Sequence, residues 1–168
     1  MADTPEADVR IEKALAQLRI LAAALVMGVA TFTAIVLLVP FHGAQAEAPP
    51  QPLLPIPLPA LGLLIGLGPL AGSFILKSVL LKPACFVPLA PETRLDAFLA
   101  KYRQATITAL ALCEGAAFMV LVFTIVDATA PKMWVLAAGL PMLGMFFHFP
   151  TRLAVDGRLD EIAAQARG

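Results

Sequence analysis

Residues 104–126, QATITALALCEGAAFMVLVFTIV, form a predominantly apolar stretch that contains a single charged residue, Glu114. A helix crosses the hydrocarbon core of a bilayer, about 30 Å thick, with about 20 mostly apolar residues, because each helical residue adds about 1.5 Å. The composition of 104–126 therefore predicts a membrane-spanning helix. The fold then depends on how many other stretches of this kind the sequence contains.

Three further stretches have the length and composition of membrane-spanning helices. They are 20–39, which carries no charge, 58–81, and 133–149, which is the shortest. Lys77 lies near the end of the second stretch, where its long side chain can reach the headgroups. Four spans predict an all-α fold, an integral membrane four-helix bundle in which residues 1–168 form a single membrane domain.

The composition agrees with this class. Of the 168 residues 60% are hydrophobic and 14% are charged, and the mean hydropathy is +0.85, whereas about a quarter of the residues in soluble domains are charged. The formal net charge is zero, which provides no basic surface for nucleic acid. The two cysteines form no CxxC motif, and no HExxH or phosphate-binding motif is present. We therefore expect a lipid-embedded protein that is not an enzyme, with no metal, no cofactor and no nucleic-acid partner.

The distribution of basic residues predicts the orientation, because cytoplasmic loops carry an excess of Lys and Arg. The basic residues beside the spans fall into three groups, which precede the first span, separate the second from the third, and follow the fourth. They are Arg10, Lys13 and Arg19; Lys82, Arg94, Lys101 and Arg103; and Arg152, Arg158 and Arg167. The other two loops carry only Lys132. Both termini are therefore predicted to be cytoplasmic, in a bacterial inner (plasma) membrane.

The segments between the spans are short. Residues 41–57 hold five prolines and no basic residue, which predicts an extended external loop. Residues 91–102 place Leu95, Phe98 and Tyr102 on one helical face, so we expect this amphipathic segment to lie on the cytoplasmic membrane surface. The tail after Pro150 is expected to form at most a short surface helix. An alternative for the first span is a signal peptide that is cleaved at the AQA sequence of residues 44–46.

Glu114 is the charged residue that the bilayer tolerates least. Ten uncharged residues precede it in its span and twelve follow it, which places it near the midplane, where a charge costs at least ~2.5–3.5 kcal/mol. We expect the carboxyl to be protonated at rest and able to exchange a proton or a cation. A structural alternative is a hydrogen bond to a neighbouring helix, for example to Thr31, Thr33 or Ser73. A contact in an assembly is a third reading.

The second span contains a glycine pattern that predicts close helix packing. Two interleaved G-x-x-x-G pairs are formed by Gly62, Gly66, Gly68 and Gly72, and this spacing lets another helix backbone approach. Pro69 removes the helical donor of the Ile65 carbonyl, which leaves an acceptor that a protonated Glu114 could use.

Residues 58–126 thus combine a glycine-rich helix, a basic loop and a returning helix with one mid-membrane Glu, KYRQATITALALCEGAAFMVLVFTIV. This arrangement resembles the helical hairpin of rotary ATPase c-type (proteolipid) subunits. The resemblance implies that the four glycines line a packing helix and that Glu114 carries H⁺ or Na⁺. The whole chain also resembles small four-span bacterial membrane proteins of unknown function, through an ALxEGA-like third helix and Pro150-Thr151.

Two functions follow as expectations. The first is a proton- or cation-handling subunit that works through Glu114 in a homo-oligomer. The second is a non-enzymatic accessory or assembly subunit of a larger membrane complex. His148, near the inner end of the fourth span, is expected to be an interface residue, and Cys113 a free thiol that points away from Glu114.

Overall fold

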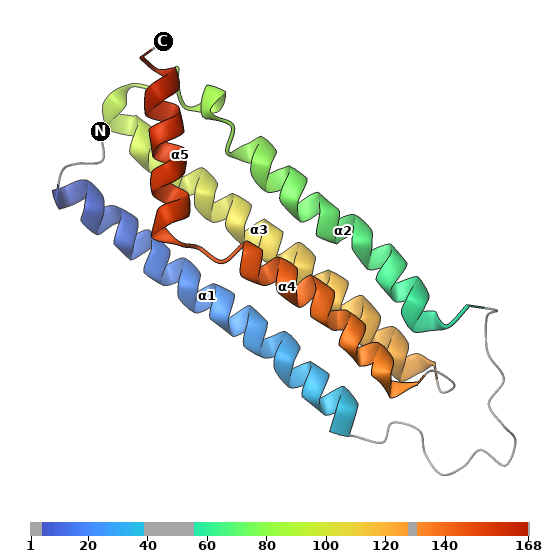
Figure 1. Ribbon diagram of the computed structural model, residues 1–168. Coiled ribbons are helices and arrows are strands. Elements are labelled where there is room, and N and C mark those ends of the chain that lie inside the picture. Colours follow the sequence, from blue (N-terminus) through green and yellow to red (C-terminus); the bar gives the residue numbers. More distant parts are fainter. Residues whose placement is uncertain (1–4, 39–55, 128–130, 168) are drawn as a thin grey trace, which may run out of the picture.

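A computed structural model of the chain describes residues 5–38, 56–127 and 131–167. Within these ranges the fold is entirely helical, which confirms the all-α prediction. The elements are α1 (Pro5–Leu38), α2 (Leu58–Leu80), the 3₁₀ helix η1 (Pro83–Cys85), α3 (Pro91–Val126), the 3₁₀ helix η2 (Lys132–Ala138), α4 (Gly139–Phe147) and α5 (Arg152–Gln165). Most of the expected external loop, 41–57, lies outside the described residues. The helices form an elongated bundle, and α1 begins at the same end of the bundle at which α5 ends (Figure 1).

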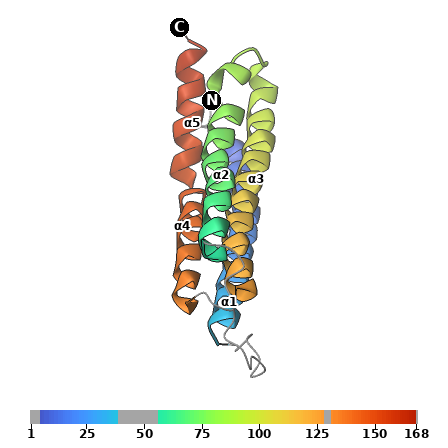
Figure 2. The ribbon, with the colours of Figure 1, turned by 90° about the vertical axis from the view of Figure 1, so that its right-hand side faces the viewer.

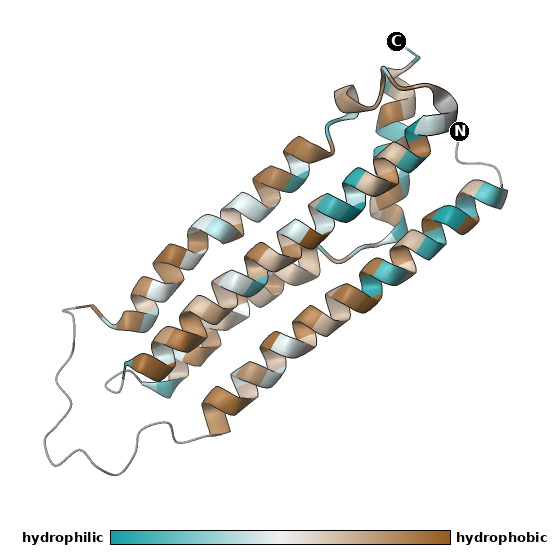
Figure 3. Ribbon diagram, turned by 180° about the vertical axis from the view of Figure 1, so that it is seen from behind, coloured by the Kyte–Doolittle hydropathy of each residue, from teal (hydrophilic) through white to brown (hydrophobic). Residues whose placement is uncertain are grey.

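Three helices, α1, α2 and α3, are long and apolar enough to cross a membrane, and a bent pair of segments would make a fourth span. The first and third helices are longer than a bilayer requires. With 34 and 36 residues they measure about 50 Å, against a hydrocarbon core of about 30 Å. Each therefore extends well beyond a bilayer. Figure 3 shows that hydrophilic residues of both helices gather towards the end that carries the chain termini.

The fourth predicted span, 133–149, consists of two kinds of helix in series. η2 contributes seven residues and α4 nine. Because a 3₁₀ helix rises about 2.0 Å per residue and an α-helix about 1.5 Å, residues 132–147 extend over about 27 Å. This short segment thus nearly matches the thickness of a hydrocarbon core. It ends at His148, after which the chain turns by 54° into α5.

α3 is the central helix of the bundle. It packs against α1, α2, α4 and η2, and in the side view it lies beside α2 with α1 behind it (Figure 2). Of its most apolar 18-residue window 44% is buried, against 17% for α1 and 22% for α2. The outer helices consequently expose large apolar side chains, such as Ile20 and Leu64, as is expected where lipid rather than water surrounds the protein.

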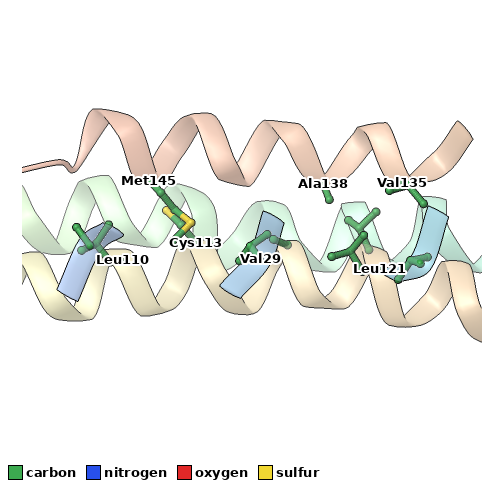
Figure 4. Close-up of a cluster of buried hydrophobic side chains, with 11 residues drawn as sticks. Val29, Leu110, Cys113, Leu121, Val135, Ala138 and Met145 are labelled. Atoms are coloured by element: carbon green, nitrogen blue, oxygen red, sulfur yellow. The ribbon is translucent and has the colours of Figure 1, made fainter. Parts of the chain in front are cut away.

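The half of the bundle away from the termini, here called the apolar half, has its own core of buried side chains, which come from α1, α3, η2 and α4. Small residues, including Ala22, Ala117 and Ala138, let the helices approach closely there. The larger side chains of this core come from α1, α3, η2 and α4 but not from α2, and Figure 4 shows several of them. They are Val29, Val36, Leu110, Cys113, Val120, Leu121, Val135 and Met145.

A second core lies at the end of the bundle that carries both termini. It is formed by side chains of α1, the α2–α3 connection, α3 and α5, namely Ile11, Leu15, Leu18, Leu81, Phe86, Phe98, Tyr102, Ala105, Val155 and Ile162. Residues 91–102, expected on the membrane surface, instead form the first third of α3 and run directly into the third span. The tail forms the 14-residue helix α5. The apolar faces of both segments are covered by other helices, so they do not need lipid to bury them.

Polar contacts join α1 to α5 and to the turn that precedes α5. Arg152 at the start of α5 bonds Asp8 of α1 at 2.6 Å and Asp156 at 2.8 Å. Arg19 of α1 donates from Nε to the carbonyl oxygen of Pro150 at 3.3 Å. Because these groups are partly exposed, each ion pair contributes about 0–1 kcal/mol. Their main effect is to fix the register of α1 against the turn between α4 and α5.

Candidate functional site

Glu114 lies in the middle of α3, at the contact with α1. Its side chain is half-buried, and its Oε1 atom is 4.0 Å from the position that a Cβ atom would occupy at Gly28 of α1. Gly28 itself is exposed. The missing side chain at Gly28 therefore makes room for the carboxyl group in a seam that reaches the outer surface of the bundle.

No other described residue offers Glu114 a hydrogen bond. Of the partners that the sequence suggested, Ser73 is engaged elsewhere, and the buried hydroxyl of Thr33 has no partner among the residues that the structure describes. The Ile65 carbonyl belongs to α2, whereas Glu114 faces α1. The carboxyl group is thus held by packing alone within the described part of the chain.

The glycine pattern of α2 divides into two pairs with different surroundings. A Cβ atom at Gly62 would lie 2.9 Å from the Met119 carbonyl oxygen, and one at Gly66 would lie 3.2 Å from the Ala116 carbonyl oxygen. These two glycines bring the backbones of α2 and α3 into contact. A Cβ atom at Gly68 or Gly72 would have no atom of another described helix within 4 Å, so this pair takes no part in the close contact with α3.

Glu114 and the packed glycines consequently lie on different sides of α3. Ala116 and Met119 face α2, whereas Glu114 faces α1. Gly62 and Gly66 thus bring α2 close to one side of α3. The helix that borders the carboxyl group, on the other side, is α1.

A buried polar cluster that the sequence did not reveal joins α2, α3 and the end of α4. The Ser73 hydroxyl donates to the Leu70 carbonyl oxygen at 2.6 Å, and Ser73 Oγ lies 2.9 Å from His148 Nε2. Cys113 Sγ donates to Ser73 Oγ at 3.5 Å. Because the hydroxyl proton is directed at Leu70, His148 is assigned as the tautomer that donates from Nε2.

The contacts of the cluster join three elements, because Ser73 belongs to α2, Cys113 to α3, and His148 follows α4. Ser73 and His148 are almost completely buried, with exposed fractions of 0% and 2%. The cluster therefore fastens the end of α4 to the other two helices. The sequence contained one signal for it, since the topology placed Lys77 and His148 at the same membrane boundary.

Lys77, one turn beyond Ser73, extends this polar region towards the end of the bundle that carries the termini. Its Nζ atom donates to the His148 carbonyl oxygen at 3.4 Å and lies 5.5 Å from the centre of the Tyr102 ring. At the opposite end, Asp127 accepts a hydrogen bond of 3.0 Å from the Leu58 backbone N–H. Asp127 thus caps α2 from the end of α3, a role that its sequence position did not indicate.

Among the residues described, no group of three His, Cys, Asp or Glu side chains could hold a metal ion. Comparisons with protein-family models, with curated proteins and with solved structures find no match. Function is therefore inferred from the geometry of this chain.

Proposed function

We propose that this protein is a multi-pass protein of the bacterial inner membrane, with both termini in the cytoplasm, that handles protons or cations through Glu114. Support for the membrane setting comes from three long apolar helices and from the exposed apolar side chains that surround them. Support for the orientation comes from the basic residues, which gather at the end of the bundle where α1 begins and α5 ends.

The observation that carries the ion-handling proposal is that Glu114 is half-buried at mid-span and has no hydrogen-bond partner among the described residues. Buried polar groups that serve structure are normally hydrogen-bonded. An ionised carboxylate is expensive in hydrocarbon, so the neutral form is favoured there. A neutral carboxyl whose proton is engaged in no internal bond can exchange it once water or a partner charge arrives.

The seam with α1 supplies a route to such a partner. Gly28 is exposed, and its lack of a side chain leaves the Glu114 carboxyl close to the outer surface of a single chain. A second copy can therefore approach this position from the side. We propose that the working form is a homo-oligomer whose subunit boundary runs past Glu114.

The test is ion flux into liposomes that contain the purified protein. A potassium diffusion potential drives protons inward, a trapped dye reports internal pH, and labelled sodium is followed in parallel. Wild-type protein should carry one of the two ions above the rate of empty liposomes. Glu114→Gln, which keeps the shape but cannot ionise, should fall to that background. Glu161→Gln, which alters an exposed carboxylate of α5, should retain the wild-type rate.

Two outcomes would refute ion handling through Glu114. One is a wild-type rate for both ions that equals the rate of empty liposomes. The other is a Glu114→Gln variant that transports as fast as the wild type.

A second candidate function is that of a non-enzymatic accessory subunit in a larger membrane complex. It is favoured by Gly68 and Gly72, because an added Cβ atom at either position would have no atom of another described helix within 4 Å, although their spacing suits close approach by a helix. In mild detergent the complex should lose mass when Gly68 is replaced by Leu and should keep it when Ala23, an exposed small residue of α1, is replaced in the same way. Glu114→Gln should leave the complex intact, and this separates the two functions.

A further inference from the structure

A cavity of about 300 Å³ opens where α2, α3, α4 and α5 meet. Its wall is formed in part by the polar cluster, because His148 and Lys77 both line it. Arg158 of α5 reaches it from the far side. The remaining wall is mainly apolar and aromatic and includes Phe74, Phe147 and Tyr102. The cavity is separate from Glu114, which faces α1.

Two cations face this cavity, and of these Lys77 has no carboxylate partner among the described residues, whereas Arg158 uses only part of its guanidinium group in an ion pair. Within the described ranges no carboxylate oxygen lies within 4.0 Å of Lys77 Nζ, whose contacts are the His148 carbonyl oxygen and the Tyr102 ring. Arg158 pairs through Nη1 with Glu161 at 2.7 Å, which leaves its Nε and Nη2 donors available in the described part of the chain. Like charges that share a partly apolar cavity repel each other, and an anion between them would remove that cost.

The depth of the cavity corresponds to a membrane boundary. Lys77 follows Leu58, the first residue of α2, by nineteen positions, which is about 29 Å along the helix and close to the thickness of a hydrocarbon core. The side chains of Phe74 and Phe147 have exposed fractions of 44% and 78%, so they lead from the cavity to the outer apolar surface. The centroids of the two rings are 6.4 Å apart.

We propose that this cavity binds a phosphate-bearing anion, and specifically the headgroup of an anionic phospholipid, between Lys77 and Arg158. A phosphate alone would use the two cations. A phospholipid would also place its acyl chains along Phe74 and Phe147, which accounts for the apolar side of the cavity. Basic pockets between membrane helices at the cytoplasmic side have the chemistry that anionic lipid headgroups require. The site depends on the proposed membrane insertion and is independent of ion handling by Glu114.

The test measures lipid binding to the delipidated, full-length protein by native mass spectrometry. Phosphatidylglycerol, phosphatidylcholine and inorganic phosphate are titrated separately. Each surface cation is worth about 1 kcal/mol towards an anionic lipid, which is about fivefold in affinity. Phosphatidylglycerol should therefore bind about thirtyfold more tightly than phosphatidylcholine. Lys77→Gln and Arg158→Gln should each lose about fivefold of this preference.

Matched variants separate the cavity from general surface charge. Lys101→Gln, which removes an exposed cation of α3 outside this cavity, should keep the wild-type affinity. Lys77→Arg should keep it as well, because it preserves the charge. Glu114→Gln should also bind normally, so that a failure of ion transport and a failure of lipid binding are distinguishable.

Three results would overturn the proposal. The first is equal affinity for phosphatidylglycerol and phosphatidylcholine, and the second is an equal loss in Lys101→Gln and Lys77→Gln. The third is competition by inorganic phosphate at the same concentration as the lipid, which would assign the cavity to a free phosphate group.

Discussion

Replacing Gly62 with alanine adds one methyl group at a tight contact between α2 and α3. The new Cβ atom would lie 2.7 Å from Phe123 Cδ2 and 2.9 Å from the Met119 carbonyl oxygen. The phenyl ring can rotate away, but the carbonyl belongs to the α3 backbone, so the two helices must separate. Overpacking of this kind costs about 1–3 kcal/mol. We expect Gly62→Ala to lower the free energy of unfolding by this amount relative to its control.

The control is Gly68→Ala, which makes the same chemical change on the same helix where no described atom lies within 4 Å. Alanine also has the higher helix propensity, by about 1 kcal/mol, and both variants share this gain. Their difference therefore isolates the contact with α3 and corresponds to about 5- to 150-fold in the folding equilibrium constant. Unfolding by SDS in mixed micelles can be followed through the fluorescence of the single tryptophan, Trp134. Equal midpoints for the two variants would contradict the packing described for Gly62.

Four further outcomes are expected. Gly66→Leu should destabilise the protein more than Gly28→Leu in the same SDS assay, because Gly66 meets the α3 backbone; equal unfolding midpoints would contradict this. Gly28→Leu should instead reduce ion flux, because its side chain would crowd the Glu114 carboxyl. An unchanged flux would contradict a role for the contact between Gly28 and Glu114. Asp127→Ala should cost about 1 kcal/mol, since it removes the cap of α2, and a variant with wild-type stability would show that this bond contributes nothing. Reporter fusions after residue 168 and within 44–51 should give cytoplasmic and external signals respectively. An external carboxyl terminus would mean that one of the four predicted spans does not cross the membrane.

The long apolar helices were predictable because a bilayer would impose a length and a composition that are visible in the sequence. The second span was expected at 58–81, and α2 is Leu58–Leu80. The 3₁₀ helix η2 was not predictable in this way, because hydropathy depends on residue type and not on the rise per residue. The short fourth segment therefore looked barely sufficient from its residue count, although its extended geometry lengthens it.

The second core could not be predicted from any one segment. The face formed by Leu95, Phe98 and Tyr102 suits a membrane surface and a protein partner equally well, because both bury apolar side chains. The partners Ile11 and Ile162 lie at the two ends of the sequence, and nothing in the local pattern brings them together. Only the folded arrangement shows that these residues cover one another.

For Glu114 the sequence indicated its position along the span but not which neighbouring helix its side chain faces. The apolar residues on both sides place it near mid-span, but the small residues around it fit an approach by α1 or by α2. The Ser73–His148 bond was hidden for a related reason, since 75 positions separate the two residues. Contacts between spans depend on how the helices are rotated, and rotation is set by packing that hydropathy does not encode.

The continuity of α3 has a mechanical consequence. Between Phe98 in the second core and Glu114 in the apolar half, the helix contains neither proline nor glycine, the residues at which sharp kinks commonly form. The sixteen residue steps from Phe98 to Glu114 therefore form a stiff helical segment about 24 Å long. A tilt of α3 at Phe98, which packs against Phe86 in the second core, would therefore also displace the Glu114 carboxyl beside Gly28. The position of Glu114 is thus coupled, through one rigid helix, to the packing of the second core.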